Sequence, residues 1–229
     1  KGETFPKHTY QTAGTYQIKI SGTLSDFGNY SESEITAGSN YYTFANYMKK
    51  LSEWGDLVAS RYGFANCKNL NYVDNKPTRN TFKNVKDMSD MFYGCTSLKT
   101  LDLSNYSITN VTNMQNMFNK MTNLASMQVS NQFVVVANSN GIFDNTNSLK
   151  AIIVSNKIPK AGAFTNVKDS LATNVKFYVP TEEAYEKSWA NDFGKERIEP
   201  ILQLVGKTPI RANINETYQD AGYLVAGFE

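Results

Sequence analysis

The chain has 229 residues, of which 41% are hydrophobic and 19% are charged, and its formal net charge is +2. This length suits one long domain or two short ones. The 23 basic and 21 acidic residues form no basic run, so we expect no nucleic-acid partner. The longest apolar run, residues 133–137, is far shorter than a membrane-spanning helix requires, and no membrane insertion of this segment is expected.

Residues 1–28 read as a β-rich lead-in or cap. In this segment Tyr16, Ile18 and Ile20 alternate with polar residues, which predicts a strand. His8 is the only histidine of the chain and fits a turn or an edge. A catalytic triad could be built on it only if it folded back across the rest of the protein. We therefore expect no enzyme activity and no cofactor.

A repeated phrase dominates residues 29–180. Each copy opens with a phenylalanine, has a cysteine, methionine or threonine three positions later, and has apolar residues six and nine positions later. The intervals between copies are 28, 26 and 25 residues. The four copies begin at Phe64, Phe92, Phe118 and Phe143. Periods of 20 to 29 residues with an L-x-x-L-x-L core are typical of leucine-rich repeats. The pattern predicts an α/β solenoid, with one strand and one short helix per repeat and β-rich segments at its ends.

Within one repeat, the strand and the helix are predicted from different periods. Leu101 and Leu103 alternate with polar neighbours, as a half-buried strand requires. Further on, Val111, Met114 and the pair 117–118 recur at helical spacing, which predicts a short helical return. The five methionines at this spacing are interpreted as core and not as a metal or cofactor site, because methionine packs well against aromatic rings. They are Met88, Met91, Met114, Met117 and Met121.

The end of the chain changes character after Pro180. Residues 181–199 are predicted to form a capping helix, in which Tyr185, Trp189 and Phe193 supply an apolar face. Residues 200–229 read as two strands around a turn, the start of a further β module that stops at Glu229.

Acidic residues do not mark a catalytic or metal site. Asp87 and Asp90 fall on the polar side of the predicted helix, and a glycosidase would need two carboxylates at a fixed separation in a cleft. Residues 144–147 resemble the start of a calcium loop, but the glycine of position 6 is missing and position 12 is Ser155 where a glutamate belongs. We interpret this segment as a turn and expect no metal.

Two cysteines, Cys67 and Cys95, occupy the same position in successive repeats. They should lie close enough for a disulfide. The equivalent positions hold Met121 and Thr146, which indicates packing and favours free buried thiols over a bridge.

Function is best sought on the outward positions of the predicted strands. These positions mix acids, tyrosines and one isoleucine, a composition that suits contact with a protein or a glycan. A merely soluble sheet face is an equally good interpretation. The candidate ligand-binding residues are Tyr72, Asp74, Thr100, Asp102, Gln128, Ile153, Lys176 and Tyr178.

The repeat closely resembles the BspA-like leucine-rich-repeat surface proteins of bacteria. The resemblance is carried by residues 92–105, FYGCTSLKTLDLSN, and residues 110–118, NVTNMQNMF. Residues 8–22 and 51–55 resemble the lead-in to such repeats, and residues 201–223 resemble the opening of a bacterial immunoglobulin-like module.

The resemblance implies an exported protein on the bacterial cell surface, with a signal and an anchor outside this segment. It would act, without catalysis, as an adhesion or ligand-binding module for a host or bacterial surface protein or glycan, as a monomer. The alternative is a structural spacer that holds other domains away from the surface. A glycan-active enzyme is the least favoured interpretation.

Overall fold

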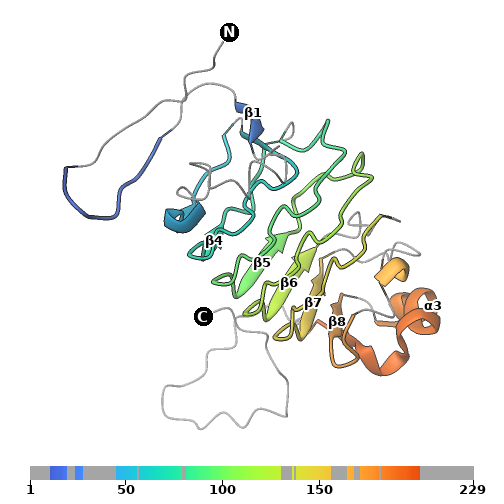
Figure 1. Cartoon of the computed structure of the whole chain (residues 1–229). Helices are drawn as coiled ribbons and strands as arrows, with labels where there is room; N and C mark the ends of the chain where they lie inside the picture. Colours follow the sequence, from blue (N-terminus) through green and yellow to red (C-terminus); the bar gives the residue numbers. More distant parts are fainter. Residues whose placement is uncertain are drawn as a thin grey trace, which may run out of the picture.

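The computed structural model describes residues 11–19, 24–27, 45–55, 57–78, 81–129, 136, 138–155, 164–167, 171–180 and 182–201. Its largest element is a five-stranded parallel sheet in which the strands follow the order of the sequence. The strands lie side by side in a row (Figure 1). They are β5 (Thr100–Leu103), β6 (Ser126–Val129), β7 (Ala151–Val154), β8 (Lys176–Val179) and β9 (Ile198–Pro200).

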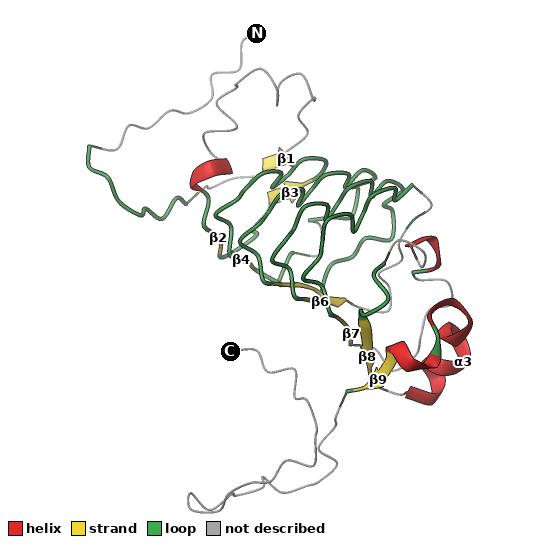
Figure 2. Cartoon of the chain, turned by 60° about the horizontal axis from the view of Figure 1, so that its bottom comes forward, coloured by secondary structure: helices red, strands yellow, loops and turns green. Residues whose placement is uncertain are grey.

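Two pairs of shorter strands precede this sheet, and the two pairs lie on different sides of the molecule. β2 (Lys50–Leu51) pairs in parallel with β4 (Tyr72–Val73), and β1 (Leu24–Phe27) pairs in parallel with β3 (Leu57–Ala59). Figure 2 shows β2 and β4 in line with the large sheet, and β1 and β3 on the opposite side. We call one of the strands β2 and β4 to β8, together with the segment that leads to it, a rung.

Polar contacts hold the rung of β4 against the rung of β5, although no strand pairing joins them. The backbone carbonyl of Asp74, directly after β4, accepts hydrogen bonds from Trp54 Nε1 at 2.6 Å and from the Tyr106 hydroxyl at 3.2 Å. Asn75 Nδ2 donates to Asp102 Oδ2 at 2.6 Å.

The segment that returns from one strand to the next is made of turns, so the prediction of a short helix in each repeat is wrong. Over residues 111–118 no helix forms. Met117 N donates to Met114 O and Asn119 N to Asn116 O, as in consecutive turns. The alternate amide groups donate to the following rung: Asn116 N to Asn140 O at 3.0 Å and Phe118 N to Ile142 O at 3.0 Å. An α-helix would keep all of these bonds within one segment.

Left-handed backbone makes this return possible. In the rung of Phe92, Asp90 has a φ of 56° and Gly94 a φ of 69°, two residues before and two after the phenylalanine. The corresponding pair in the next rung is Asn116 at 53° and Lys120 at 60°. Glycine and asparagine adopt such angles more easily than other residues. The 26 asparagines of the chain suit a backbone that must turn in this way in every rung.

The four repeat phenylalanines form a continuous buried column. Adjacent rings are near parallel, with centroids 5.5 Å apart for Phe64 and Phe92, 6.2 Å for Phe92 and Phe118, and 5.5 Å for Phe118 and Phe143. The five repeat methionines are buried around this column, as their spacing predicted: Met88, Met91, Met114, Met117 and Met121.

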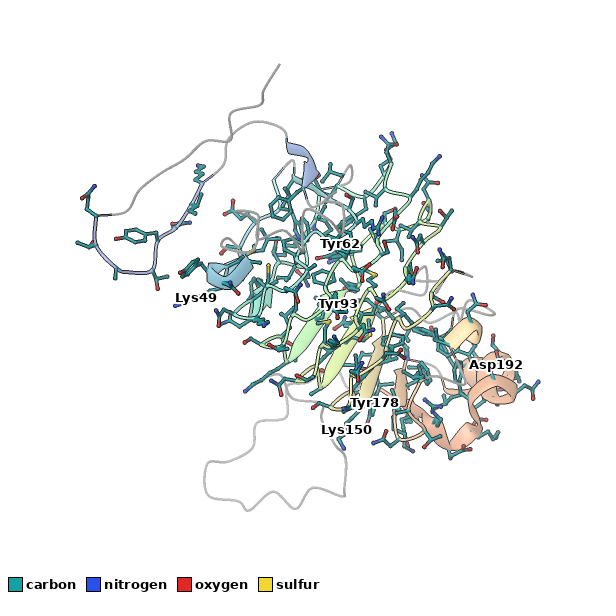
Figure 3. The ribbon with its side chains drawn as sticks, viewed as in Figure 1. Lys49, Tyr62, Tyr93, Lys150, Tyr178 and Asp192 are labelled. Atoms are coloured by element: carbon teal, nitrogen blue, oxygen red, sulfur yellow. The ribbon has the colours of Figure 1, made fainter. Side chains whose placement is uncertain are left out.

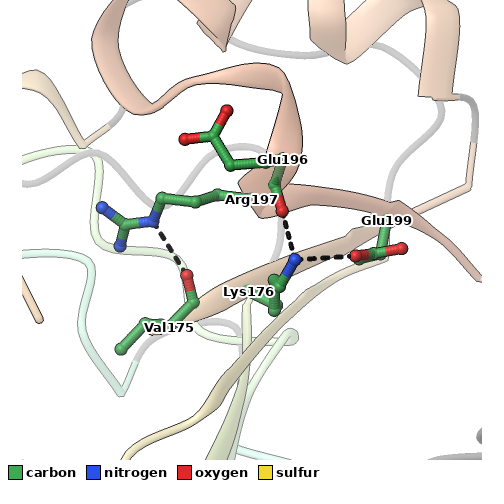
Figure 4. A network of polar contacts seen from close by, with 5 residues as sticks. All are labelled: Val175, Lys176, Glu196, Arg197 and Glu199. Atoms are coloured by element: carbon green, nitrogen blue, oxygen red, sulfur yellow. Dashed lines mark hydrogen bonds and ion pairs between the residues drawn. The ribbon is translucent and has the colours of Figure 1, made fainter. Parts of the chain in front are cut away.

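The helix α3 (Glu182–Phe193) covers the C-terminal end of the stack. It is shorter than the helix predicted over 181–199, because Gly194, with a φ of 82°, ends it and the chain then enters β9. Trp189 is buried against Phe177 of β8 and against Phe164, which directly precedes the short 3-10 helix η1 (Thr165–Val167). After α3 the 3-10 helix η2 (Lys195–Arg197) leads into β9. The buried Arg197 donates from Nε to Val175 O at 2.9 Å (Figure 4). Because Val175 directly precedes β8, this bond fixes η2 against the start of that strand.

The ends of the chain differ in part from expectation. Residues 11–19 contain no strand, and the side chains of Tyr16 and Ile18 are exposed, so the strand predicted over 16–20 is absent as far as Lys19. Alternation of three apolar residues does not by itself make a strand, because a strand needs a partner for its hydrogen bonds. The immunoglobulin-like module expected over 200–229 does not begin at Pro200, because Pro200 is the last residue of β9 and pairs with Val179. Ile20, His8 and residues 202–229 lie outside the described residues.

Candidate ligand-binding surface

The outward side chains of the large sheet lie in one row. Asp102 is paired in register with Gln128, Gln128 with Ile153, and Ile153 with Tyr178. The row follows from strand alternation, since the neighbouring residues Leu101, Leu103 and their equivalents are buried. Pairing in β9 adds Glu199 beside Tyr178, a position that the sequence analysis did not include.

The second row of candidates is one step nearer the start of each strand. Thr100 is paired with Ser126, Ser126 with Ala151, and Ala151 with Lys176. Among these, Thr100 is exposed and the other three are half-buried. The structure therefore brings six of the eight candidates together on β5 to β8.

The carboxylate of Asp102 is used inside the protein. Its Oδ1 accepts a hydrogen bond from Ser104 N at 2.8 Å, and its Oδ2 accepts one from Asn75 Nδ2 at 2.6 Å. These bonds close the turn after β5 and join the β5 rung to the β4 rung. A ligand would have to compete with both of them, which leaves Gln128, Ile153 and Tyr178 as the more available part of the row.

Tyr72 and Asp74 lie on the rung of β4, at the far end of the face. The Tyr72 ring is 44% exposed, and the Lys50 ammonium lies 4.6 Å from its centroid. Asp74 is half-buried directly after the strand. Together with Lys50, Tyr72 offers a cation and an aromatic plane, which are separated from Tyr178 by the strands β5 to β7.

Lys176 is held by an ion pair and by the backbone of η2. Its Nζ lies 2.9 Å from Glu199 Oε1 and also donates to Glu196 O (Figure 4). The side chains of the pair are 38% and 42% exposed, so solvent screens the attraction and the pair adds little stability. Its effect is positional, because it fixes Glu199 next to Tyr178.

Both cysteines are free and buried, as the sequence analysis favoured. Cys95 Sγ donates to Phe64 O at 3.0 Å in the preceding rung. Burial raises the pKa of the Cys67 thiol to about 12 and that of Cys95 well above its usual value. Protonated thiols are poor nucleophiles and poor metal ligands, so these residues act in packing.

The acidic positions considered for catalysis or metal binding serve local turns. Asp87 Oδ1 accepts hydrogen bonds from Ser89 N at 2.8 Å and Ser89 Oγ at 2.6 Å. In the segment that resembled a calcium loop, Asn145 has a φ of 59° and Asp144 N donates to Gly141 O, which is turn geometry. Within the part of the chain that the structure describes, no three histidine, cysteine or acidic residues converge as a metal site. No helix among these residues has the length and apolar character of a membrane span.

The equivalent rungs define a repeat protein built from strand-and-turn units. Residues 59–177, just over half of the chain, match a family described as Mycoplasma protein of unknown function, DUF285, and the chain belongs to that family. The match begins at the end of β3 and ends within β8, so it covers every rung of the phenylalanine column. A search of curated proteins found no match.

Proposed function

We propose that the chain is a non-catalytic binding module of a bacterial cell surface, and that it holds a protein or glycan ligand on the face of β5 to β9. The observation that carries the proposal is the contiguous outward row of Gln128, Ile153 and Tyr178. A tyrosine beside an isoleucine, with polar residues around them, has the composition of a recognition surface. The surface location rests on the resemblance to BspA-like proteins.

The same proposal includes the architecture. We propose that the rungs form a leucine-rich-repeat solenoid over 29–180, preceded by a β-rich cap over 1–28 and closed by α3. The continuous phenylalanine column, with neighbouring ring centroids 5.5 to 6.2 Å apart, and the shared strand register support it. Solenoids of this kind present extended surfaces and seldom enclose a catalytic pocket.

The test is a ligand screen with paired variants of the chain. Matrix proteins, glycans and bacterial surface proteins are screened for binding to the native protein. The double variant Ile153→Ser with Tyr178→Ala should lose binding, because a few aromatic and apolar residues carry most of the affinity of an interface. The matched control, Gln115→Ala with Asn116→Gly, changes the outer side of a return and should bind normally.

Two results would redirect the proposal. Loss of binding in the control alone would place the recognition surface on the returns. A screen without any ligand would favour a structural spacer, the alternative function. Circular dichroism of each variant shows whether it is folded, since an unfolded variant would also lose binding.

A further inference from the structure

Lysines occupy every second rung at the margin where the parallel strands begin. The equivalent position in five successive rungs is the residue directly before the strand. Backbone bonds establish the equivalence within two groups: Asn71 N donates to Lys49 O at 2.9 Å, and Ala125 N donates to Lys99 O at 2.8 Å and Lys150 N to Ala125 O at 2.9 Å. Between the groups, Asn71 and Lys99 correspond because each directly precedes its strand. We call this series the lysine edge; in order it holds Lys49, Asn71, Lys99, Ala125 and Lys150.

The lysine edge is open to solvent and carries uncompensated charge. All five of its residues are exposed. Among the described residues, no carboxylate lies within ion-pair distance of Lys49, Lys99 or Lys150. The one polar contact of these three ammonium groups that the structure gives is from Lys49 Nζ to Thr15 Oγ1 at 3.3 Å, and a hydroxyl leaves the charge in place. Figure 3 shows Lys49 and Lys150 on the same margin of the molecule.

The spacing of these charges follows from the strand spacing. Paired parallel strands lie about 4.8 Å apart, so Lys99 and Lys150, which precede β5 and β7, are about 9.6 Å apart along the edge. Lys49 lies two rungs before Lys99, across the unpaired step from β4 to β5. A pyranose residue in an extended polysaccharide advances by about one strand spacing. A chain with one acidic group in every second sugar would therefore present its negative charges at the interval of the lysines.

We propose that the lysine edge binds a linear acidic polysaccharide whose charged and neutral sugars alternate. Each lysine would pair with one acidic group, and the neutral sugars would lie over the rungs between. Asn71 offers amide donors and acceptors to sugar hydroxyls, and the small side chain of Ala125 leaves room for a ring. Tyr72, 44% exposed beside Lys50, supplies an aromatic plane next to the edge.

The charge density favours a polysaccharide over a nucleic acid. Double-stranded DNA carries a phosphate about every 3.4 Å along each strand, and its binders neutralise several of them with clustered lysine and arginine. The three edge lysines are too sparse for that, and the net charge of the chain is only +2. This surface is distinct from the strand face of β5 to β9, so the inference does not rest on the function proposed there.

The experiment measures binding of a hyaluronan decasaccharide, which has one carboxylate per disaccharide, by calorimetry at low salt. The triple variant Lys49→Gln, Lys99→Gln and Lys150→Gln should bind at least about tenfold more weakly than the native chain. A matched control replaces three exposed lysines of the β4–β5 connection with glutamine and removes the same charge. These are Lys76, Lys83 and Lys86, and this control should bind within about twofold of the native chain.

A second variant tests the spacing itself. Ala125→Lys combined with Lys150→Ala keeps the number of lysines and moves one of them by a single rung, and binding should weaken by at least about threefold. Unchanged binding in this variant, an equal loss in the control triple, or no binding of the decasaccharide by the native chain would each overturn the proposal. The proposal would also be overturned if the native chain bound single-stranded DNA more tightly than the decasaccharide, and if the triple variant of Lys49, Lys99 and Lys150 lost that binding. Ile153→Ser with Tyr178→Ala should retain decasaccharide binding, which separates this inference from the strand-face function.

Discussion

Replacement of Phe118 by alanine would break the phenylalanine column at an internal rung. The ring is fully buried, and it stacks on Phe92 at 6.2 Å and on Phe143 at 5.5 Å. Truncation of a buried phenylalanine costs about 3 to 5 kcal/mol, from lost transfer free energy and from the cavity that remains. Because both neighbouring rungs lose a partner, we expect about 4 kcal/mol for Phe118→Ala, a large part of the stability of an ordinary domain.

Urea titration measures this loss at both ends of the stack. The two tryptophans, Trp54 and Trp189, are buried near opposite ends, so their fluorescence reports on each end. With a slope of about 2 to 3 kcal/mol per molar urea, a loss of 4 kcal/mol lowers the midpoint by roughly 1.3 to 2 M. Phe118→Leu keeps an apolar side chain without a ring and should cost about 1 to 2 kcal/mol, which provides a variant that remains folded.

The control is Gln115→Ala in the same return. Gln115 is exposed, and its hydrogen bonds use the backbone, which the substitution keeps. Its N donates to Asn113 Oδ1 at 3.1 Å, and its O accepts from Asp90 N at 2.8 Å. Its free energy of unfolding should change by less than about 0.5 kcal/mol. Equal midpoint shifts for Gln115→Ala and Phe118→Ala, or a shift below about 1 kcal/mol for Phe118→Ala, would refute the argument that the ring joins adjacent rungs.

Three further outcomes are expected. Asn116→Ala should destabilise by about 1 to 2 kcal/mol because Asn116 has a φ of 53°, whereas Asn116→Gly should be near neutral in the same titration. Gly94→Ala should cost more than Asn116→Ala, since its Cβ would lie 2.8 Å from Asn66 Oδ1 at a φ of 69°. Burial raises the pKa of the Cys67 thiol from 9.0 to about 12, so a thiol reagent should not label the folded protein at pH 8 but should label it in urea. The thiol ionises at a lower pH in the unfolded chain than in the folded one. The free energy of unfolding should therefore fall as the pH rises from 9 to 12, which a pH series of thermal melts measures.

The repeat period predicted the strand register because strand pairing fixes one rung per repeat. Intervals of 26 and 25 residues separate Asp102 from Gln128 and Gln128 from Ile153, and the structure pairs these residues directly. Pairing also brings Tyr178 into the row, although no phenylalanine phrase marks its rung. The period could not show which side chains of the row form hydrogen bonds within the protein. The bond from Asn75 Nδ2 to Asp102 Oδ2, for example, depends on a turn that has no sequence signature of its own.

The helix was predicted wrongly because buried positions three and four residues apart are shared by a helix and by consecutive turns. The distinguishing signal lay in the residues two before and two after each phenylalanine. All eight of these residues have positive φ. Six of them are aspartate, asparagine or glycine (Asp90, Asn116 and Gly141 before the ring, Asn66, Gly94 and Asn145 after it), and the other two are Tyr62 and Lys120. Aspartate, asparagine and glycine in these columns favour left-handed turns and disfavour a continuous helix.

The phenylalanine column and the lysine edge both depend on the spacing between rungs, but they are formed by different side chains. Lys99 and Lys150 directly follow the buried residues Leu98 and Leu149, so their separation is set by how the rungs stack. A variant such as Phe118→Leu that weakens the core without unfolding it keeps the strand pairing and therefore the lysine interval. It should lose stability and retain its affinity for the hyaluronan decasaccharide. An affinity that fell in step with stability would show that the edge depends on the packing of the ring itself, and not on the strand spacing alone.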